Sequence, residues 1–347
     1  MIKSRSNPII TTVDKSKLNN HFSKPGFNQL FQIFKKNNFE LRIVGGAVRD
    51  FLLGKEPNDL DFATNATMYE MKRMFDKQAI TLIHETKEKY GIITAKMNDK
   101  EVYEITTLKI NIASKTGRKW EMDASTRDLT INAMFLDLSG NVYDYFYGFD
   151  DLKKKKVVFV GNPVQRIRAD YLRIFRYFRF YGLIADHPNN HDNTTINAIK
   201  QTISGLNKIH GERIWSEWEK ILNGNYGCEI TLKLIECGIS PHCGLPANPN
   251  IEEFKRVYHE CSKKNVSLRP ITLVTLLLEN VLDVLNLHTR LKLPDDDRDL
   301  AFFLIREHVN KTENRNLQYY QNMKSTKIYI SELIKCNCNF DYLSFFT

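Results

Sequence analysis

Two aspartates separated by one residue, Asp59 and Asp61, are the first candidates for catalytic chemistry in this sequence. Alternate side chains of a β-strand lie on one face, so both carboxylates would project together while Leu60 and Phe62 point into the core. Such a pair repels itself unless a cation lies between the two groups. A hard divalent ion with oxygen ligands, above all Mg²⁺, suits it best. The pair alone also fits a solvated strand end.

A glycine turn lies shortly before this pair. Gly45 and Gly46 join a predicted strand, residues 41–44, to a predicted helix, residues 47–54. The first turn of such a helix directs backbone N–H groups towards an anion, and Arg49 adds a positive charge. The turn is neither a P-loop nor a dinucleotide-binding fingerprint, because it lacks GK[ST] and GxGxxG.

A third carboxylate, Glu104, occupies an alternating position of another predicted strand, residues 101–110. A neighbouring strand could bring it to the same metal ions, although an exposed strand residue is an equal alternative. Together, a glycine turn, an arginine and paired carboxylates describe a site for a nucleoside triphosphate and two metals. One metal would activate an attacking hydroxyl group and the other would stabilise the leaving pyrophosphate.

A second charged group lies in the segment RIRADYLRIFRYFRFYGL, which begins at Arg166. Interpreted as one helix, it places Asp170 and three arginines along a polar stripe at spacings of three residues, opposite an apolar face. A solvated basic face is the alternative interpretation. The three arginines are Arg173, Arg176 and Arg179.

The elements that must position these residues follow from the hydrophobic periodicity. Up to about residue 160 we expect an α+β unit around a mixed sheet, and beyond Asn162 the pattern is helical, with residues 241–250 as the clearest linker. Further helices are predicted near 27–39, 67–78 and 126–136, and further strands at 59–64 and 90–97.

The motifs, in order, resemble those of a known family. GGAVRDFLLG with NDLD, RDLTINAMFLD, YDYFYGFDDL, ADYLRIFRYFRF and GERIWSEWEKIL are similar to motifs A to E of class II tRNA nucleotidyltransferases, the CCA-adding enzymes. The match covers about residues 41–223. It implies a polymerase-beta-type nucleotidyltransferase head with a mixed sheet, followed by an all-helical neck, body and tail that hold tRNA. The implied activity is template-independent addition of C, C and A to the tRNA 3′ end from CTP and ATP.

The resemblance also implies a domain division and residue roles. A flexible tail (1–27) would precede the head (28–160), the neck (161–235) and the tRNA-binding body and tail (236–347). Asp59 and Asp61 would bind two Mg²⁺ ions, and Glu104 would join them as a catalytic carboxylate. The implied nucleotide-binding residues are Gly45, Gly46, Arg49, Arg127, Asp128, Asp170 and Arg173, with Arg176 and Arg179 beside them.

Hydrogen-bond chemistry explains how Asp170 and Arg173 could select both C and A. Cytosine and adenine each present an amino donor beside a ring-nitrogen acceptor, which matches a carboxylate beside a guanidinium group. Uracil and guanine reverse that order and would leave two buried polar groups unmatched, at about 1–3 kcal/mol each.

The sequence departs from the family pattern at three places. Thr126 stands where a further arginine precedes the motif B Arg-Asp pair, and Ala169 stands where motif D usually has Glu. The segment from Lys109 to Asp123, which resembles the family's flexible loop, is short. Thr126 puts part of the sugar and phosphate binding in question, and Ala169 the positioning of Asp170. The short loop puts the switch from adding C to adding A in question.

Composition limits the partners. The 347 residues carry 50 Lys and Arg against 41 Asp and Glu, a net charge of +9 that favours a polyanion such as tRNA. The most apolar stretch, from Ile271, is interrupted by Glu279 and Asp283, so we expect no membrane partner. Six cysteines without CxxC spacing indicate reduced thiols in an intracellular protein, cytoplasmic or mitochondrial or both, or nuclear.

Two rival functions share these motifs. A bacterial-type poly(A) polymerase has the same head and neck motifs and differs mainly in its product. A catalytically silent tRNA-binding homologue would keep the fold, but the intact Asp59, Asp61 and Arg127 argue against it. The sequence leaves the oligomeric state open.

Overall fold

The computed structural model describes residues 4–14, 21–83, 85–109, 119–309, 316–323 and 325–346. The chain divides into two compact units, Met1–Asn162 and Pro163–Thr347. This division lies two residues after the predicted end of the head, whereas the further predicted boundary at residue 235 stays a prediction. No helix of the described residues has the length and apolar character needed to cross a membrane.

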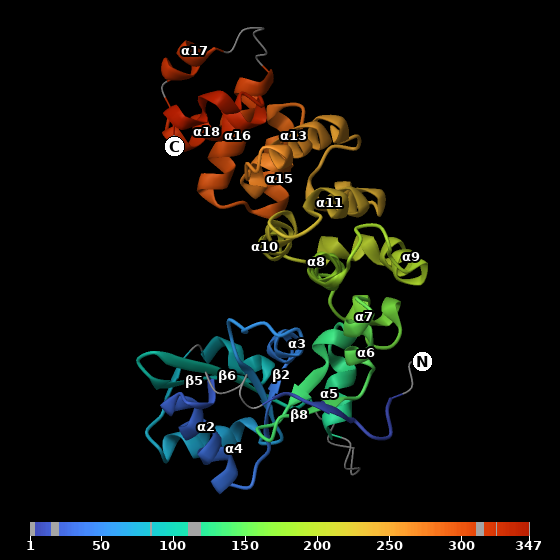
Figure 1. Ribbon diagram of the computed structural model, residues 1–347, viewed down its shortest axis with the longest axis vertical. Helices are drawn as coiled ribbons and strands as arrows, with labels where there is room; N and C mark the ends of the chain where they lie inside the picture. Colours follow the sequence, from blue (N-terminus) through green and yellow to red (C-terminus); the bar gives the residue numbers. More distant parts are fainter. Residues whose placement is uncertain are drawn as a thin grey trace. The chain divides into compact units, whose positions relative to one another are not determined.

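The first unit is built on one eight-stranded sheet in the order β1-β8-β7-β2-β3-β6-β5-β4 (Figure 1). Among the described strands, β3 and β6 are the one parallel pair, and the other neighbours are antiparallel, so the sheet is mixed as predicted. The strands are β1 (Ile9–Thr12), β2 (Leu41–Val44), β3 (Asp61–Thr64), β4 (Thr81–Ile83), β5 (Ile92–Asn98), β6 (Glu101–Thr107), β7 (Met134–Leu136) and β8 (Asn141–Asp144).

Helices α2 (Pro25–Lys36) and α4 (Met68–Asp76) lie together on one side of this sheet (Figure 1). Apolar residues on one face of α2 meet the inward side chains of the sheet: the rings of Phe27 and Phe62 are 5.8 Å apart. Helix α5 (Lys119–Thr126) packs Trp120 against Phe135 of β7, with ring centroids 5.1 Å apart. The remaining helical segments are α3 (Gly46–Leu52), α6 (Gly148–Lys153) and the 3₁₀ helices η1 (Glu85–Tyr90) and η2 (Thr130–Asn132).

The helix predicted for residues 126–136 is wrong. Helix α5 ends at Thr126, and the Asp128 carboxylate accepts the backbone N–H of Leu129 at 2.8 Å, a local bond that competes with helix formation. The apolar run 134–136 then pairs with both β2 and β8. A short buried run of this kind does not distinguish helix from strand by periodicity, which is why the prediction failed.

The predicted flexible tail, residues 1–27, is also incorrect where it is described. Residues 9–12, with the β-branched sequence IITT, form the edge strand β1 on β8, and α2 already begins at Pro25. The N–H of Arg5 donates to the carbonyl of Tyr145 at 3.0 Å, so backbone pairing begins before the strand itself. An otherwise open edge of the sheet explains why this segment is ordered.

The regular secondary structure of the second unit is helical among its described residues. Helices α8 (Arg173–Ile184) and α10 (Gly211–Leu222) pack through Phe175 and Trp218, whose ring centroids are 6.1 Å apart. The remaining helices are α7 (Pro163–Ala169), α9 (Asn193–Thr202), η3 (Ile203–Lys208), α11 (Gly227–Glu236), α12 (Ser240–Cys243), α13 (Ile251–Lys263), α14 (Pro270–Thr275), α15 (Val281–Leu291), α16 (Asp295–Val309), α17 (Leu317–Gln321), α18 (Lys327–Cys336) and η4 (Phe340–Phe345). Within the predicted linker 241–250, α12 ends at Cys243, and Asn250 caps α13.

Candidate active site

The glycine turn connects β2 to α3 at the centre of the sheet. Val44, the last residue of β2, pairs with Asp61, the first residue of β3. Gly45 follows with φ of 69°, a left-handed conformation that glycine adopts without strain, and α3 begins at Gly46. The turn therefore lies next to the first strand carboxylate, as the sequence predicts.

The three predicted carboxylates lie at one edge of the β3–β6 pair. Asp61 and Glu104 are direct neighbours across these parallel strands, and Asp59 precedes β3 in the chain. Leu60 and Phe62 are 7% and 1% exposed, which confirms the predicted alternation. Their burial orients the strand and leaves the aspartates on the opposite face.

Electrostatics show that these carboxylates interact. Asp61 is accessible to solvent, yet the surrounding protein still desolvates its carboxylate, and this burial raises its pKa. Repulsion from Glu104 and then from Asp59 raises the pKa further, while Arg127 and Lys87 lower it. Lys87 of η1 forms an ion pair with Glu104. The strand end thus concentrates negative charge that nearby cations only partly offset.

This charge suits a divalent cation. Carboxylate oxygens are the ligands that Mg²⁺ prefers. Burial is the main cause of the raised pKa of Asp61, and repulsion from Glu104 and Asp59, which a bound cation would relieve, adds to it. Among the described residues, no three carboxylate, imidazole or thiol groups already converge as a complete set of metal ligands. Substrate phosphates commonly complete such a shell.

Arg127 lies on the glycine side of the carboxylates. An atom added as a Cβ at Gly45 would lie 3.7 Å from the nearer Arg127 nitrogen, so the guanidinium group borders the turn. Asp123, one helical turn earlier and nearly buried, accepts two bonds from it, at 3.0 and 3.1 Å. The same carboxylate accepts the backbone N–H of Lys109 at 3.2 Å. Asp123 thereby fixes Arg127 and the chain that leaves β6.

Arg49 lies beneath the turn instead of extending into solvent. It is 6% exposed, and it donates to Asp50 at 2.9 and 3.0 Å and to the side-chain oxygen of Asn132 at 2.7 Å. Asn132 in turn donates to Asp128 at 3.4 Å. This chain of contacts joins motif A to motif B. Sequence reasoning missed the roles of Asp123 and Asn132, although Asn132 stands within the RDLTINAMFLD motif.

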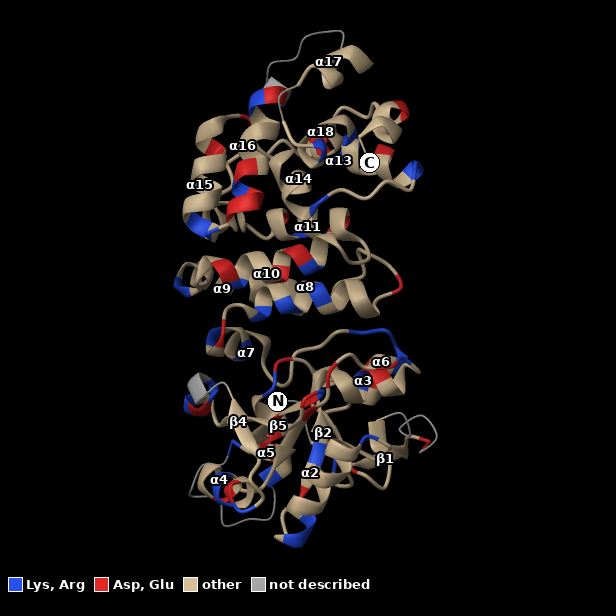
Figure 2. Ribbon diagram, turned by 90° about the vertical axis from the view of Figure 1, so that its left-hand side faces the viewer, with Lys and Arg blue, Asp and Glu red and all other residues tan. Residues whose placement is uncertain are grey.

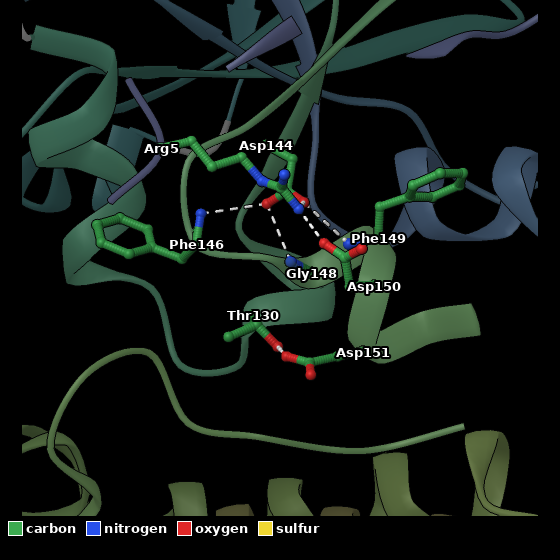
Figure 3. A network of polar contacts seen from close by, with 8 residues as sticks. All are labelled: Arg5, Thr130, Asp144, Phe146, Gly148, Phe149, Asp150 and Asp151. Carbon is green, nitrogen blue, oxygen red and sulfur yellow. Dashed lines mark hydrogen bonds and ion pairs between the residues drawn. The ribbon is translucent and has the colours of Figure 1, made fainter. Parts of the chain in front are cut away.

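The YDYFYGFDDL motif supports motif B through a network of polar contacts (Figure 3). Asp144 is fully buried, and its carboxylate accepts the backbone N–H groups of Phe146, Gly148 and Phe149 at 3.2, 2.9 and 3.0 Å. Burial raises the pKa of Asp144, while these hydrogen bonds and Arg5 oppose the shift. The carboxylate thus ties the end of β8 to the first turn of α6.

A second contact carries this support to motif B. Thr130 of η2 donates its hydroxyl to Asp151 of α6 at 2.7 Å (Figure 3). A Cβ at Gly148 would lie 2.1 Å from the carbonyl oxygen of Thr130, so only glycine permits this close approach. Helix α6 therefore holds in place the segment that carries Arg127 and Asp128.

In the second unit, the polar stripe is not one continuous helix. Helix α7 ends at Ala169 and α8 begins at Arg173, so Asp170 stands in the break. Its carboxylate accepts the N–H of Leu172 at 3.1 Å, the local bond by which aspartate favours a turn before a helix. It also forms an ion pair with Arg213 of α10 at 3.1 Å. Asp170 and Arg173 nevertheless remain neighbours, because the N–H of Arg173 donates to the Asp170 carbonyl at 3.0 Å.

Arg173, Arg176 and Arg179 are all partly exposed, whereas the aromatic residues between them are buried. Positively charged residues colour parts of the α8 ribbon blue in Figure 2. Arg173 donates to the carbonyl of Arg166 at 3.1 Å. Arg179 donates to Glu217 of α10 at 3.0 Å, and Glu217 is 6% exposed. The guanidinium groups of Arg176 and Arg179 also lie 5.4 and 4.4 Å from the ring centre of Phe180. The basic face is thus held in place by carbonyl, carboxylate and aromatic partners.

The predicted residues therefore fall into two groups. Gly45, Gly46, Asp59, Asp61, Glu104 and Arg127 border one region of the first unit, with Arg49 and Asp128 beneath it. Asp170, Arg173, Arg176 and Arg179 form a second group in the other unit. Thr126, the departure in motif B, donates its hydroxyl to the carbonyl of Asp123 at 2.8 Å. Most of the segment that resembles the flexible loop, residues 110–118, lies outside the described residues.

Comparisons with known proteins agree with this architecture. Residues 41–158 match a family model described as the poly A polymerase head domain, and residues 192–243 match one described as a probable RNA and SrmB binding site of polymerase A. Solved structures with a similar fold include a Thermotoga maritima CCA-adding enzyme complexed with tRNA (TM-score 0.72, 20% identity, 97% of this chain and 86% of that one). Another is a Bacillus stearothermophilus CCA-adding enzyme in complex with CTP (TM-score 0.68, 23% identity, 93% and 82%). These likenesses confirm the predicted fold class of a nucleotidyltransferase head followed by a helical part.

The sequence relatives have more specific names than the matched family models. The chain is 47% identical over 292 residues to the mitochondrial CCA tRNA nucleotidyltransferase 1 of Mus musculus and 46% identical over 292 residues to that of Homo sapiens. Each match covers 81% of this chain and 66% of the relative, so the chain spans just under two thirds of their length. A CCA-adding enzyme of Ligilactobacillus salivarius is 34% identical over 64% of this chain and 55% of its own length. Its motifs in order, its fold and these relatives make the chain similar to the CCA-adding enzymes, a family of tRNA nucleotidyltransferases, over 81% of its own length.

Proposed function

We propose that this chain adds C, C and A to the 3′ end of tRNA, using CTP and ATP without a template. The observation that carries the proposal is the group of three carboxylates, Asp59, Asp61 and Glu104, beside a glycine turn and Arg127. Negative charge on one side and anion-binding groups on the other are what a metal-bound triphosphate requires. Similarity to the CCA-adding enzymes supports tRNA as the acceptor.

The carboxylates would hold two Mg²⁺ ions, with Asp59 and Asp61 as the main ligands. When bound, such ions activate the attacking hydroxyl group and stabilise the leaving pyrophosphate. The N–H groups at the start of α3 and the Arg127 guanidinium group bind the phosphates, and Asp123 keeps that guanidinium group oriented. The RNA 3′ oxygen forms a bond to the α-phosphorus, the bond to pyrophosphate breaks, and the hydroxyl proton passes to solvent water.

Arg49 and Asp128 complete the nucleotide site from below. Both are nearly buried, at 6% and 7% exposure, and Asn132 lies between them. Their contacts fix the backbone of the turn against motif B. We therefore propose that Arg49 and Asp128 shape the phosphate and ribose site. They contact the nucleotide directly only where its atoms lie close to the turn.

Base selection is assigned to Asp170 and Arg173, with Arg176 and Arg179 beside them. The Asp170 contact with Arg213 does not oppose this role, because the Arg213 side chain is 49% exposed and such ion pairs contribute only about 0–1 kcal/mol. A cytosine or adenine amino group can replace it as the donor to the carboxylate. The carboxylate and guanidinium then form the shared recognition edge for both bases.

A poly(A) polymerase is the second candidate, because both matched family models are described as parts of poly A polymerase or polymerase A. The named relatives from mouse, human and Ligilactobacillus favour CCA addition instead. The mouse and human relatives are named as mitochondrial, which favours mitochondria as the compartment of this chain. They give no support to a nuclear location.

The test uses the full chain and three forms of one tRNA, ending before CCA, at C and at CC. Labelled CTP or ATP is supplied alone, and products are sized at single-nucleotide resolution. We expect CTP alone to add two residues to the first form, one to the second and none to the third. ATP alone should add one residue only to the form ending at CC. Extension of all three forms by ATP would instead identify a poly(A) polymerase.

A further inference from the structure

The three carboxylates of the proposed metal site, Asp59, Asp61 and Glu104, have different surroundings on their two sides. Asp61 pairs with Val44 of β2 on one side and with Glu104 of β6 on the other. The glycine turn and Arg127 lie on the β2 flank. A cavity of about 530 Å³ opens on the β6 flank, and neither the glycines nor Arg127 line it. The nucleotide site therefore leaves a separate space beside the same carboxylates.

The cavity combines the three carboxylates with two lysines from separate segments. Lys24 precedes α2, and Lys100 lies in the turn between β5 and β6. Both are exposed, and neither ammonium group has an ion-pair partner among the described residues. Unpaired cations beside a metal-binding acidic group provide contacts for a ligand that is itself anionic.

One part-buried contact fixes the backbone next to both lysines. The Glu101 carboxylate accepts the backbone N–H groups of Gly26 and Phe27 at 3.0 and 3.1 Å, and the Tyr103 hydroxyl at 2.8 Å. A Cβ at Gly26 would lie 2.9 Å from the Glu101 carboxyl carbon, so the start of α2 is pressed against this side chain. Lys24 lies two residues before Gly26, and Lys100 directly precedes Glu101. The geometry thus brings the two segments together at the cavity.

The other basic group of the cavity does not supply a fixed positive charge. His21 is 6% exposed, and its Nε2 lies 2.9 Å from a Glu56 oxygen. Burial lowers the pKa of His21, Lys24 lowers it further, and Glu56 opposes the shift. The lysines are therefore the cations that this cavity offers to a ligand at neutral pH.

We propose that Lys24 and Lys100 bind the phosphodiester next to the 3′ hydroxyl of the RNA that is being extended. This inference rests on the proposed nucleotidyl transfer. In an in-line displacement the attacking oxygen and the leaving pyrophosphate lie on opposite sides of the phosphorus. With the triphosphate at the glycine turn, the RNA end enters from the β6 flank. A phosphate contact also serves all three additions, because the terminal base changes while the backbone does not.

The test compares Lys24→Gln, Lys100→Gln and the double variant with the wild-type full chain. Lys35→Gln is the matched control, because Lys35 is exposed on the last turn of the same helix. Initial rates are measured on tRNA ending at CC with ATP and on tRNA ending before CCA with CTP. We expect the KM for tRNA to rise about threefold in each single variant and about tenfold in the double variant. The KM for ATP and CTP should stay within about twofold of wild type.

Binding of the same tRNAs without nucleotide separates this inference from the proposed function. The double variant should reduce the slope of log Kd against log salt by about one, whether or not nucleotides are added. An enzyme that binds tRNA through both lysines but adds nothing would refute the proposed function alone. A raised KM for ATP and CTP with unchanged tRNA binding would place the triphosphate at these lysines and overturn the inference. Unchanged constants in every assay would also overturn it.

Discussion

At the scale of single residues, Asp61 is the point at which the proposed metal site meets the proposed phosphate site. It is the direct strand neighbour of both Val44, before the glycine turn, and Glu104. Its pKa is raised by burial and by two neighbouring carboxylates, and lowered by Arg127 and Lys87. A carboxylate that has both negatively and positively charged neighbours can hold a cation next to a bound anion.

Asp61→Asn should abolish addition of both nucleotides and leave tRNA affinity within about twofold. Loss of a metal carboxylate removes several kcal/mol from the transition state, so kcat should fall at least about a hundredfold for CTP and for ATP. Asp76→Asn, at the exposed end of α4, is the control. Quantitative gel assays with each nucleotide measure the effect, and loss of only one nucleotide's addition would contradict a shared metal site.

Asp170 and its partner Arg213 allow base reading to be distinguished from a purely structural role. Asp170→Ala should reduce the kcat/KM ratios of CTP to UTP and of ATP to GTP by about ten- to a hundredfold, because the mismatched bases no longer meet a carboxylate. Arg213→Gln removes the ion pair but keeps the acceptor, so its ratios should change little. Equal losses in the two variants would show that Asp170 only secures α10.

At the scale of elements, motif C acts as a support for motif B. Asp144 accepts three backbone N–H groups at the start of α6, and Asp151 of that helix accepts the Thr130 hydroxyl. None of these atoms belongs to the proposed nucleotide site. The motif therefore fixes the segment that carries Arg127, a residue of the proposed nucleotide site.

Asp144→Ala should lower the free energy of unfolding by about 3 kcal/mol, because it leaves buried N–H groups without an acceptor. Asp150→Ala is the control: its side chain is 44% exposed and pairs with Arg5, so we expect a loss below about 1 kcal/mol. Urea unfolding followed by circular dichroism measures both. Equal losses in the two variants would show that the Asp144 hydrogen bonds do not stabilise the head.

The sequence predicts well those features that depend on local patterns. Strand 41–44 has the predicted bounds, and alternation correctly places Leu60 and Phe62 in the core. Contacts between distant segments were not predictable in this way. Arg49 lies beneath its turn because Asn132, 83 residues later, accepts its hydrogen bond. The break at Asp170 escaped prediction because the amphipathic pattern continues through it, although aspartate commonly stops a helix by bonding the backbone.

At the scale of the whole molecule, the net charge of +9 predicts that binding of tRNA is largely electrostatic. A protein that must accept many tRNA sequences gains from phosphate contacts, which carry no sequence information. Affinity should fall at least about thirtyfold between about 50 and 200 mM salt, as expected when three or more phosphates are neutralised. Fluorescence anisotropy across this range measures it, and an affinity that barely changes would exclude this mode of binding.

The central claim is that the chain builds the sequence CCA without a template. The most direct measurement supplies the full chain with all four nucleoside triphosphates and a tRNA that ends before CCA, and then sequences the 3′ ends. We predict that the added residues are C, C and A, that extension then stops, and that Asp61→Asn leaves the ends unchanged. Tails of adenosine, frequent U or G, or tRNA left unextended by the wild-type chain would contradict the account.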